Sequence, residues 1–99
     1  MEIKIQSIHF DATEKLQDFI QKKATKLEKT YESIQKVEIQ LKVVKPATTL
    51  NKEADITVTV PGTQMHVEKV CNTFEESVDQ AVDSLKIQLT KFKEKMRGR

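Results

Sequence analysis

TFEESVDQAVDSLKIQLTKFKEKMR, residues 73–97, decides the fold, because this stretch predicts one long helix with a single apolar side. Apolar residues recur in it at steps of three and four, the spacing that aligns side chains along one face of an α-helix. Thr73 and Glu76 have the spacing of a capping box, which predicts that the helix begins there. The apolar stripe consists of Phe74, Val78, Ala81, Val82, Leu85, Leu89, Phe92 and Met96.

Segments in which apolar and polar residues alternate predict four strands upstream of this helix. They cover residues 2–6, 37–43, 55–60 and 64–70. The apolar parity changes after Ser7, which predicts a bulge or a bend near this residue. Pro46 and a polar run end the second strand, and Pro61-Gly62 predicts a tight turn after the third. For the fourth strand the sequence does not decide which face is buried. Met65 and Val67 favour one face, whereas His66 and Val70 favour the other.

A second amphipathic helix is predicted between the first two strands, with Asp11 or Thr13 as its N-cap. Its apolar stripe consists of Leu16, Phe19, Ile20, Ala24, Leu27 and Tyr31. The element order is therefore β-α-β-β-β-α, and the helical crossover predicts that the first two strands pair in parallel. Each strand buries one face and each helix one stripe. We therefore expect a two-layer α+β fold, with both helices side by side on one face of a four-stranded mixed sheet.

The length of 99 residues predicts one domain spanning 1–99. Cys71 is the only cysteine, which excludes a disulfide framework and predicts a small buried side chain. No stretch has the length of a transmembrane span or the pattern of a signal peptide, so a cytoplasmic protein is expected. His9 and His66 have no neighbours at metal-ligand spacing. Because no catalytic pattern or glycine-rich phosphate loop is present, we expect no enzyme, cofactor, metal or small-molecule substrate.

The net charge of +2 hides a strong partition along the chain. Residues 53–85 carry seven acids and one lysine, a balance of −6, whereas residues 86–99 carry six bases and one acid, a balance of +5. Acids suit the start of a helix and bases its end, but this effect fades within one turn. The basic block is longer than that. It indicates a polyanionic partner.

The lysines follow the two helices in bands. On a helical wheel, Lys15, Lys22, Lys26 and Lys29 share one side of the first helix, and Lys23 lies between them and the apolar stripe. In the last helix one flank carries Lys86, Lys93 and Arg97, and the other carries Lys91 and Lys95. If the helices lie side by side, these side chains can border the groove between them and contact successive phosphates.

Two other interpretations remain open. The lysines can form an ordinary solvated surface, and the acidic region 53–83 can serve a protein–protein interaction module that binds no RNA. There is no tryptophan, and all five aromatic residues occupy core-like positions, namely Phe10, Phe19, Tyr31, Phe74 and Phe92. This pattern argues against base stacking. Recognition of the backbone and shape of a folded RNA stays possible.

The chain resembles a known family in three stretches and in the order of its elements. They are Thr13-Glu14, Lys26-Leu27-Glu28 and residues 88–95, QLTKFKEK. With the β-α-β-β-β-α order, they are similar to the short ribosome hibernation-promoting factors, also called ribosomal subunit interface proteins or ribosome-associated inhibitors. The resemblance implies binding to 16S ribosomal RNA of the small subunit. It implies that translation is inhibited in stationary phase or stress because the protein occupies the mRNA and tRNA channel, without chemistry.

The resemblance also implies which residues bind the RNA. Lys23, Lys26, Lys91, Lys93 and Lys95 match basic positions of the family, and the helical wheel adds Lys22, Lys29, Lys86 and Arg97. The chain departs from the family pattern at Gln17, at Ile87 and at Thr73-Phe74-Glu75. Longer members carry a C-terminal dimerisation domain that we do not expect here. We expect a monomer away from the ribosome.

Overall fold

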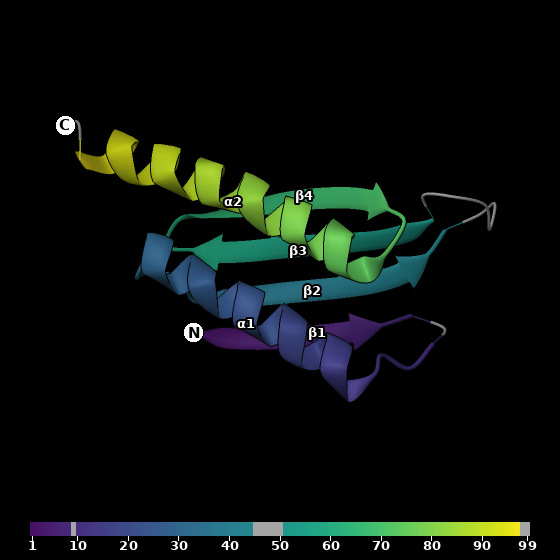
Figure 1. Cartoon of the computed structure of the whole chain (residues 1–99). Helices are drawn as coiled ribbons and strands as arrows, with labels where there is room; N and C mark the ends of the chain where they lie inside the picture. The colour runs from purple at the N-terminus through teal and green to yellow at the C-terminus, as the bar shows by residue number, and fades with distance from the viewer. Residues whose placement is uncertain (9, 45–50, 98–99) are drawn as a thin grey trace.

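The computed structural model describes residues 1–8, 10–44 and 51–97, without the side chain of Arg97. His9 and Pro46, which the sequence analysis mentions, lie outside these residues. The elements follow the predicted order, with these bounds: β1 (Glu2–Ser7), α1 (Glu14–Thr30), β2 (Lys36–Val43), β3 (Lys52–Val60), β4 (Thr63–Cys71) and α2 (Phe74–Arg97). Figure 1 shows both helices on one face of the sheet, which confirms the predicted two-layer α+β fold.

The four strands form one mixed sheet in the order β1-β2-β3-β4. β1 pairs in parallel with β2 across the α1 crossover, as predicted, and the other two pairs are antiparallel. The register places Ile3, Val37, Val58 and Met65 in one row across the sheet. Val37 and Val58 are buried, so this row faces the helices. The register thereby settles the face of β4, where Val67 is buried.

Both predicted helix starts are capped by threonine. The Leu16 amide N–H donates to the Thr13 hydroxyl oxygen at 3.1 Å, so Thr13 rather than Asp11 caps α1. At the start of α2 the Glu76 N–H donates to the Thr73 hydroxyl oxygen, also at 3.1 Å. The Glu76 carboxylate in turn accepts from the Asn72 N–H at 3.4 Å. These bonds satisfy amides that no helical carbonyl reaches.

The core lies between the helices and the sheet. The buried stripe of α1 consists of Leu16, Ile20, Ala24 and Leu27, and that of α2 includes Val78, Ala81, Val82, Leu85 and Leu89. Cys71 is buried as predicted. Ser77 is also fully buried, and its hydroxyl donates to the carbonyl of Lys52 at 2.6 Å, which ties α2 to β3. Among the described residues, neither helix combines the length and the apolarity that a membrane span requires.

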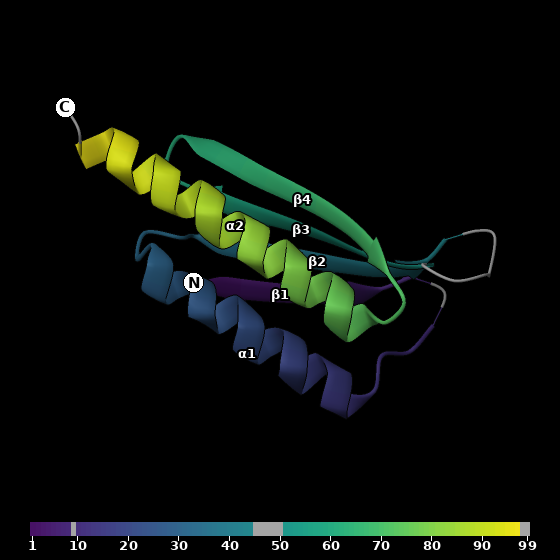
Figure 2. The same ribbon diagram turned by 45° about the horizontal axis from the view of Figure 1, so that its top comes forward.

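Three expectations about the edges of elements are wrong. Met96 is 64% exposed, because the last turns of α2 extend beyond the sheet (Figures 1 and 2) and have no strand beneath them. Val43 is 46% exposed at the end of β2. β3 begins at Lys52 rather than at Asp55, since Lys52 pairs with Val43 on one side and with Cys71 on the other.

Candidate nucleic-acid interface

Three side-chain contacts fix how the two helical segments lie against each other. Phe10, just before α1, stacks on Phe74 with ring centroids 4.9 Å apart. Lys23 Nζ lies 2.6 Å from Asp79 Oδ1. Tyr31, the C-cap of α1, meets Phe92 edge-on with centroids 5.6 Å apart. The partners advance together along the chain, so α1 and α2 run side by side in the same direction, as Figure 2 shows.

The ion pair also identifies the flanks that face each other. Residues Asp79, Lys86 and Lys93 are seven apart, which is about two helical turns, so they share one flank of α2. Asp79 shows that this flank faces α1. On α1 the flank of Lys23 faces α2, and Lys26 follows it by one turn. Helical spacing therefore places Lys26 on the flank of α1 that faces α2, and Lys86 and Lys93 on the flank of α2 that faces α1.

The ammonium group of Lys23 is already paired with a carboxylate. It donates to Asp79 at 2.6 Å and lies 5.6 Å from the centroid of the Phe19 ring. The Lys23 side chain is 25% exposed, which is less than the 47% of Asp79. The sequence analysis treats Lys23 as a phosphate ligand. The structure instead pairs its charge with a carboxylate, because Asp79 from the acidic start of α2 lies opposite.

The exposed side of α1 forms a shallow groove of about 420 Å³, which we call the α1 groove. It is lined by Asp18, Gln21, Lys22, Thr25, Lys26 and Lys29. Three of the predicted phosphate ligands thus gather on one surface. Asp18 is the acid among them.

Lys91 and Lys95 lie on the other flank of α2, where they border a groove beside the β3–β4 turn. We call this the hairpin groove; it is lined by Thr63, Met65, Gln88, Lys91, Phe92 and Lys95. A third groove, the outer groove, runs along the solvent side of α2 and is lined by Lys86, Ile87, Thr90, Lys91 and Glu94. Lys22, Lys26 and Lys29 therefore lie together on α1, and Lys91 borders both grooves of α2, with Lys95 on one and Lys86 on the other. Arg97 ends α2, and its side chain is outside the described part.

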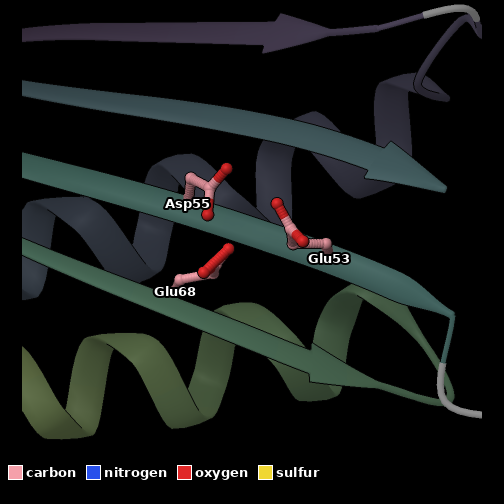
Figure 3. A group of neighbouring side chains, drawn as sticks. All are labelled: Glu53, Asp55 and Glu68. Atoms are coloured by element: carbon pink, nitrogen blue, oxygen red, sulfur yellow. The ribbon is translucent and has the colours of Figure 1, made fainter. Parts of the chain in front are cut away.

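The face of the sheet opposite the helices carries an acidic cluster (Figure 3), formed by Glu53, Asp55 and Glu68. One carboxylate oxygen of each lies within 4.8 Å of the others. Lys42 Nζ lies 3.1 Å from Glu53 Oε2 and 3.9 Å from Asp55 Oδ2. Glu53 is almost fully buried, with 7% of its side chain exposed. The Lys42 ammonium thus already supplies positive charge where a metal ion would bind.

One of these carboxyl groups, that of Asp55, has a raised pKa. Burial raises the pKa of Asp55 to about 6, and the hydrogen bond and negative charge of Glu53 and the charge of Glu68 act in the same direction. The hydrogen bond and charge of Glu53 raise the pKa of Lys42. This cluster was not predicted from the sequence. Its signal is the acid pair Glu53 and Asp55 at strand spacing, but Glu68 joins them only through the β3–β4 register, which sets Asp55 opposite Glu68.

The acidic region 53–83 does not form one surface. Glu53, Asp55 and Glu68 lie on the open face of the sheet, whereas Asp79 pairs with α1 on the helical side. Glu76 is used in the cap of α2. The open face and the helical layer therefore differ in character, because acids cluster on the first and most of the predicted phosphate ligands are exposed on the second.

Comparison with known proteins identifies the family of this chain. Residues 3–97 match the family model described as Sigma 54 modulation protein / S30EA ribosomal protein. The chain belongs to this family of ribosome-associated factors, and its predicted family resemblance is confirmed.

Its relatives include the ribosome hibernation promoting factor of Escherichia coli K12, 32% identical over 97 residues, which are 98% of each chain. The ribosome hibernation promoting factor of Pseudomonas putida is 27% identical over 99% of this chain and 92% of its own. A ribosomal subunit interface protein from Coxiella burnetii shares the fold with a TM-score of 0.83 and 24% identity, covering 94% of this chain and 98% of that one. The N-terminal domain of Thermus thermophilus Protein Y gives a TM-score of 0.80 at 25% identity, covering 93% and 99%.

Proposed function

We propose that this chain is a translation inhibitor that binds 16S ribosomal RNA of the small subunit and blocks the mRNA and tRNA channel during stationary phase or stress. It acts by occupancy as a single ribosome-binding domain, without catalysis, cofactor, metal or small-molecule substrate. A ribosomal target places it in the cytoplasm, and the chain is a monomer away from the ribosome. Its phosphate ligands are Lys22, Lys26, Lys29, Lys86, Lys91, Lys93, Lys95 and Arg97. Lys23 can bind a phosphate only when its ion pair with Asp79 opens.

The observation that carries this proposal is the clustering of exposed lysines on the helical side of the molecule. Lys22, Lys26 and Lys29 are exposed and line the α1 groove, and exposed Lys91 and half-buried Lys86 line the outer groove on α2. Exposed ammonium groups at helical spacing suit successive phosphates and release counterions on binding. The membership in a family of ribosome-associated factors supports a ribosomal partner over another polyanion.

Sedimentation with purified small subunits tests the proposal. The wild-type chain is expected to sediment with the subunit, and binding is expected to weaken steeply with salt because several phosphates are neutralised. Charge reversal at Lys26, Lys91 and Lys93 is expected to release the protein. The matched control reverses Lys4, Lys36 and Lys69, which belong to the strands, and is expected to leave sedimentation in place. Release by the control alone would contradict the assigned surface.

The alternative, a protein–protein module based on the acidic region, predicts the opposite behaviour. Its complex would survive RNase treatment and would be insensitive to the lysine reversals. The separation of Glu53, Asp55 and Glu68 from Asp79 argues against one docking surface made of the whole region. RNase treatment of the bound complex distinguishes the two functions.

A further inference from the structure

The hairpin groove has a composition that phosphate binding by surface lysines does not require. It is an open groove of about 450 Å³ between the start of β4 and the second half of α2. The α1 groove and the outer groove have comparable volumes, so composition rather than size distinguishes it. None of its six described lining residues is acidic, whereas the α1 groove contains Asp18 and the outer groove contains Glu94.

Phe92 and Met65 supply the apolar part of this groove. Both are half-buried and pack against the core, so each keeps part of its side chain at the groove. The Phe92 ring meets Tyr31 at an interplanar angle of 81°, an edge-on contact that holds the ring in place. The sequence analysis placed Phe92 in the core and therefore argued against stacking. The structure instead leaves an oriented aromatic ring and a thioether partly open to a ligand.

The rim of the groove is cationic and polar. Lys91 and Lys95 are four residues apart and lie on one flank of α2, one turn from each other. Both are exposed. Gln88 and Thr63 add an amide and a hydroxyl, which donate to and accept from the polar edge of a bound group. An apolar floor beside two ammonium groups matches the two parts of a nucleotide, a flat base and an anionic phosphate.

We propose that the hairpin groove binds one unpaired nucleobase of RNA. Phe92 and Met65 contact the face of the base, and Lys91 and Lys95 bind the phosphates that flank it. The base is unpaired because a base within a duplex offers no free face, and proteins recognise single-stranded RNA by stacking splayed bases on aromatic side chains. This inference rests on the proposed binding of ribosomal RNA. It adds a base-binding contact to a surface so far defined by phosphates.

The first test is the Phe92→Leu variant, which keeps an apolar side chain and removes the flat ring. Its affinity for small subunits is expected to fall roughly tenfold, the effect of losing one stacked base. The slope of log Kd against log salt is expected to stay unchanged, because no phosphate contact is removed. Lys91→Gln and Lys95→Gln are each expected to reduce that slope by about 1.

The matched control is Phe10→Leu, the same substitution in a half-buried ring that stacks on Phe74 away from the groove. Urea unfolding of both variants shows whether a loss of affinity reflects a loss of folding. If the wild-type chain binds and Phe92→Leu binds with the same affinity, the base site is overturned and the proposed function stays intact. Failure of the wild-type chain to bind overturns the proposed function itself.

The second test does not alter the floor of the groove. A photoreactive benzophenone amino acid replaces Thr63 at the rim or, as a control, His66 on the open face of the sheet. Position 63 is expected to crosslink to an unpaired nucleotide of 16S ribosomal RNA, and position 66 is not. A crosslink from position 63 to a ribosomal protein or a paired nucleotide overturns the proposal. Absence of any crosslink from position 63, when the subunit is bound, also overturns it.

Discussion

The ammonium of Lys23 lies 2.6 Å from Asp79 Oδ1, so the two helices meet at a pair of opposite charges. Such a partly exposed pair contributes only about 0–1 kcal/mol to folding. Its larger effect is on the charge of the interface, because one carboxylate cancels one ammonium next to Lys26. Asp79, at the acidic start of α2, therefore weakens the attraction of phosphates to the surface around Lys23 and Lys26.

Removing that carboxylate is expected to strengthen RNA binding. In Asp79→Asn, Lys23 is released from its ion pair and becomes free to contact a phosphate. The affinity for small subunits is expected to rise, and the slope of log Kd against log salt to steepen by about 1. Filter binding at several salt concentrations measures both. Asp83→Asn, one turn further along α2, is the matched control, because it removes the same charge and leaves the Lys23–Asp79 pair in place. An equal effect of both variants would show that overall charge, rather than release of Lys23, is responsible.

Asp55 predicts a pH dependence of stability. Its pKa is about 6 in the folded protein and near 3.8 in the unfolded chain, so the folded state binds more protons between these values. Stability therefore falls as pH rises from about 4 to 6 and then stays level. The Asp55→Asn variant is expected to be more stable than wild type by about 1–3 kcal/mol at pH 7.5. That gain is expected to vanish near pH 4.

Urea unfolding at pH 4 and pH 7.5 measures this difference. The exposed acid Glu28 provides the control, because Glu28→Gln removes one charge from α1 away from the cluster. An advantage of Asp55→Asn that is equal at both pH values would show that the raised pKa of Asp55 does not cause the gain in stability.

Elements are set by local signals, and the threonine caps are examples. The Thr73 hydroxyl accepts the Glu76 N–H, and the Glu76 carboxylate accepts the Asn72 N–H. Thr73→Ala removes the first of these bonds and is expected to lower the free energy of unfolding by about 0.5–2 kcal/mol. Thr90→Ala, in the exposed middle of α2, is expected to be neutral or slightly stabilising, because alanine favours helix. Chemical denaturation compares the two. Equal stability of Thr73→Ala and wild type would mean that this cap is dispensable.

The same local signals explain which elements could be predicted from sequence. Helix periodicity and capping residues depend on neighbours a few positions away, so both helices and the Thr73 cap were predicted correctly, and the cap of α1 was narrowed to Asp11 or Thr13. The buried face of β4 depends on its pairing with β3, where Val58 lies opposite Met65, and so could not be derived from β4 alone. Likewise, Met96 continues the apolar stripe of α2, but nothing in the sequence shows that the sheet ends before it.

The candidate site was predictable to the extent that it lies within single helices. The wheel places Lys91 and Lys95 together on one flank, and both line the hairpin groove. The helical wheel could not show that this flank borders the β3–β4 turn, nor that Asp79 reaches Lys23. Both facts depend on how α2 lies on the rest of the molecule. The cluster of Glu53, Asp55 and Glu68 was missed for the same reason, because it is assembled from two strands.

At the scale of the whole molecule, the acidic cluster and the helical lysines lie on opposite sides of the sheet. The acidic cluster lies on the open face, and both helices with their lysines cover the other. A polyanion approaching this molecule is therefore oriented before contact, with the helical layer toward it. Within that layer the α1 groove and the hairpin groove lie on either side of α2, so a bound RNA meets them as separate contacts.

This separation predicts additive effects on binding. Lys26 lines the α1 groove and Lys91 lines the hairpin groove, with no lining residue in common between the two. Distant residues without shared partners contribute independently, within about 0.5 kcal/mol. The losses of binding free energy in Lys26→Gln and Lys91→Gln are therefore expected to sum in the double variant. Lys26 and Lys29 share the α1 groove, so their double variant is expected to deviate from additivity. Kd values for wild type, the three single variants of Lys26, Lys29 and Lys91, and the two double variants, all at one salt concentration, decide this. If the Lys26 and Lys91 variants are strongly coupled, the RNA meets both grooves as one contact, and the division of the interface by α2 would have no consequence for binding.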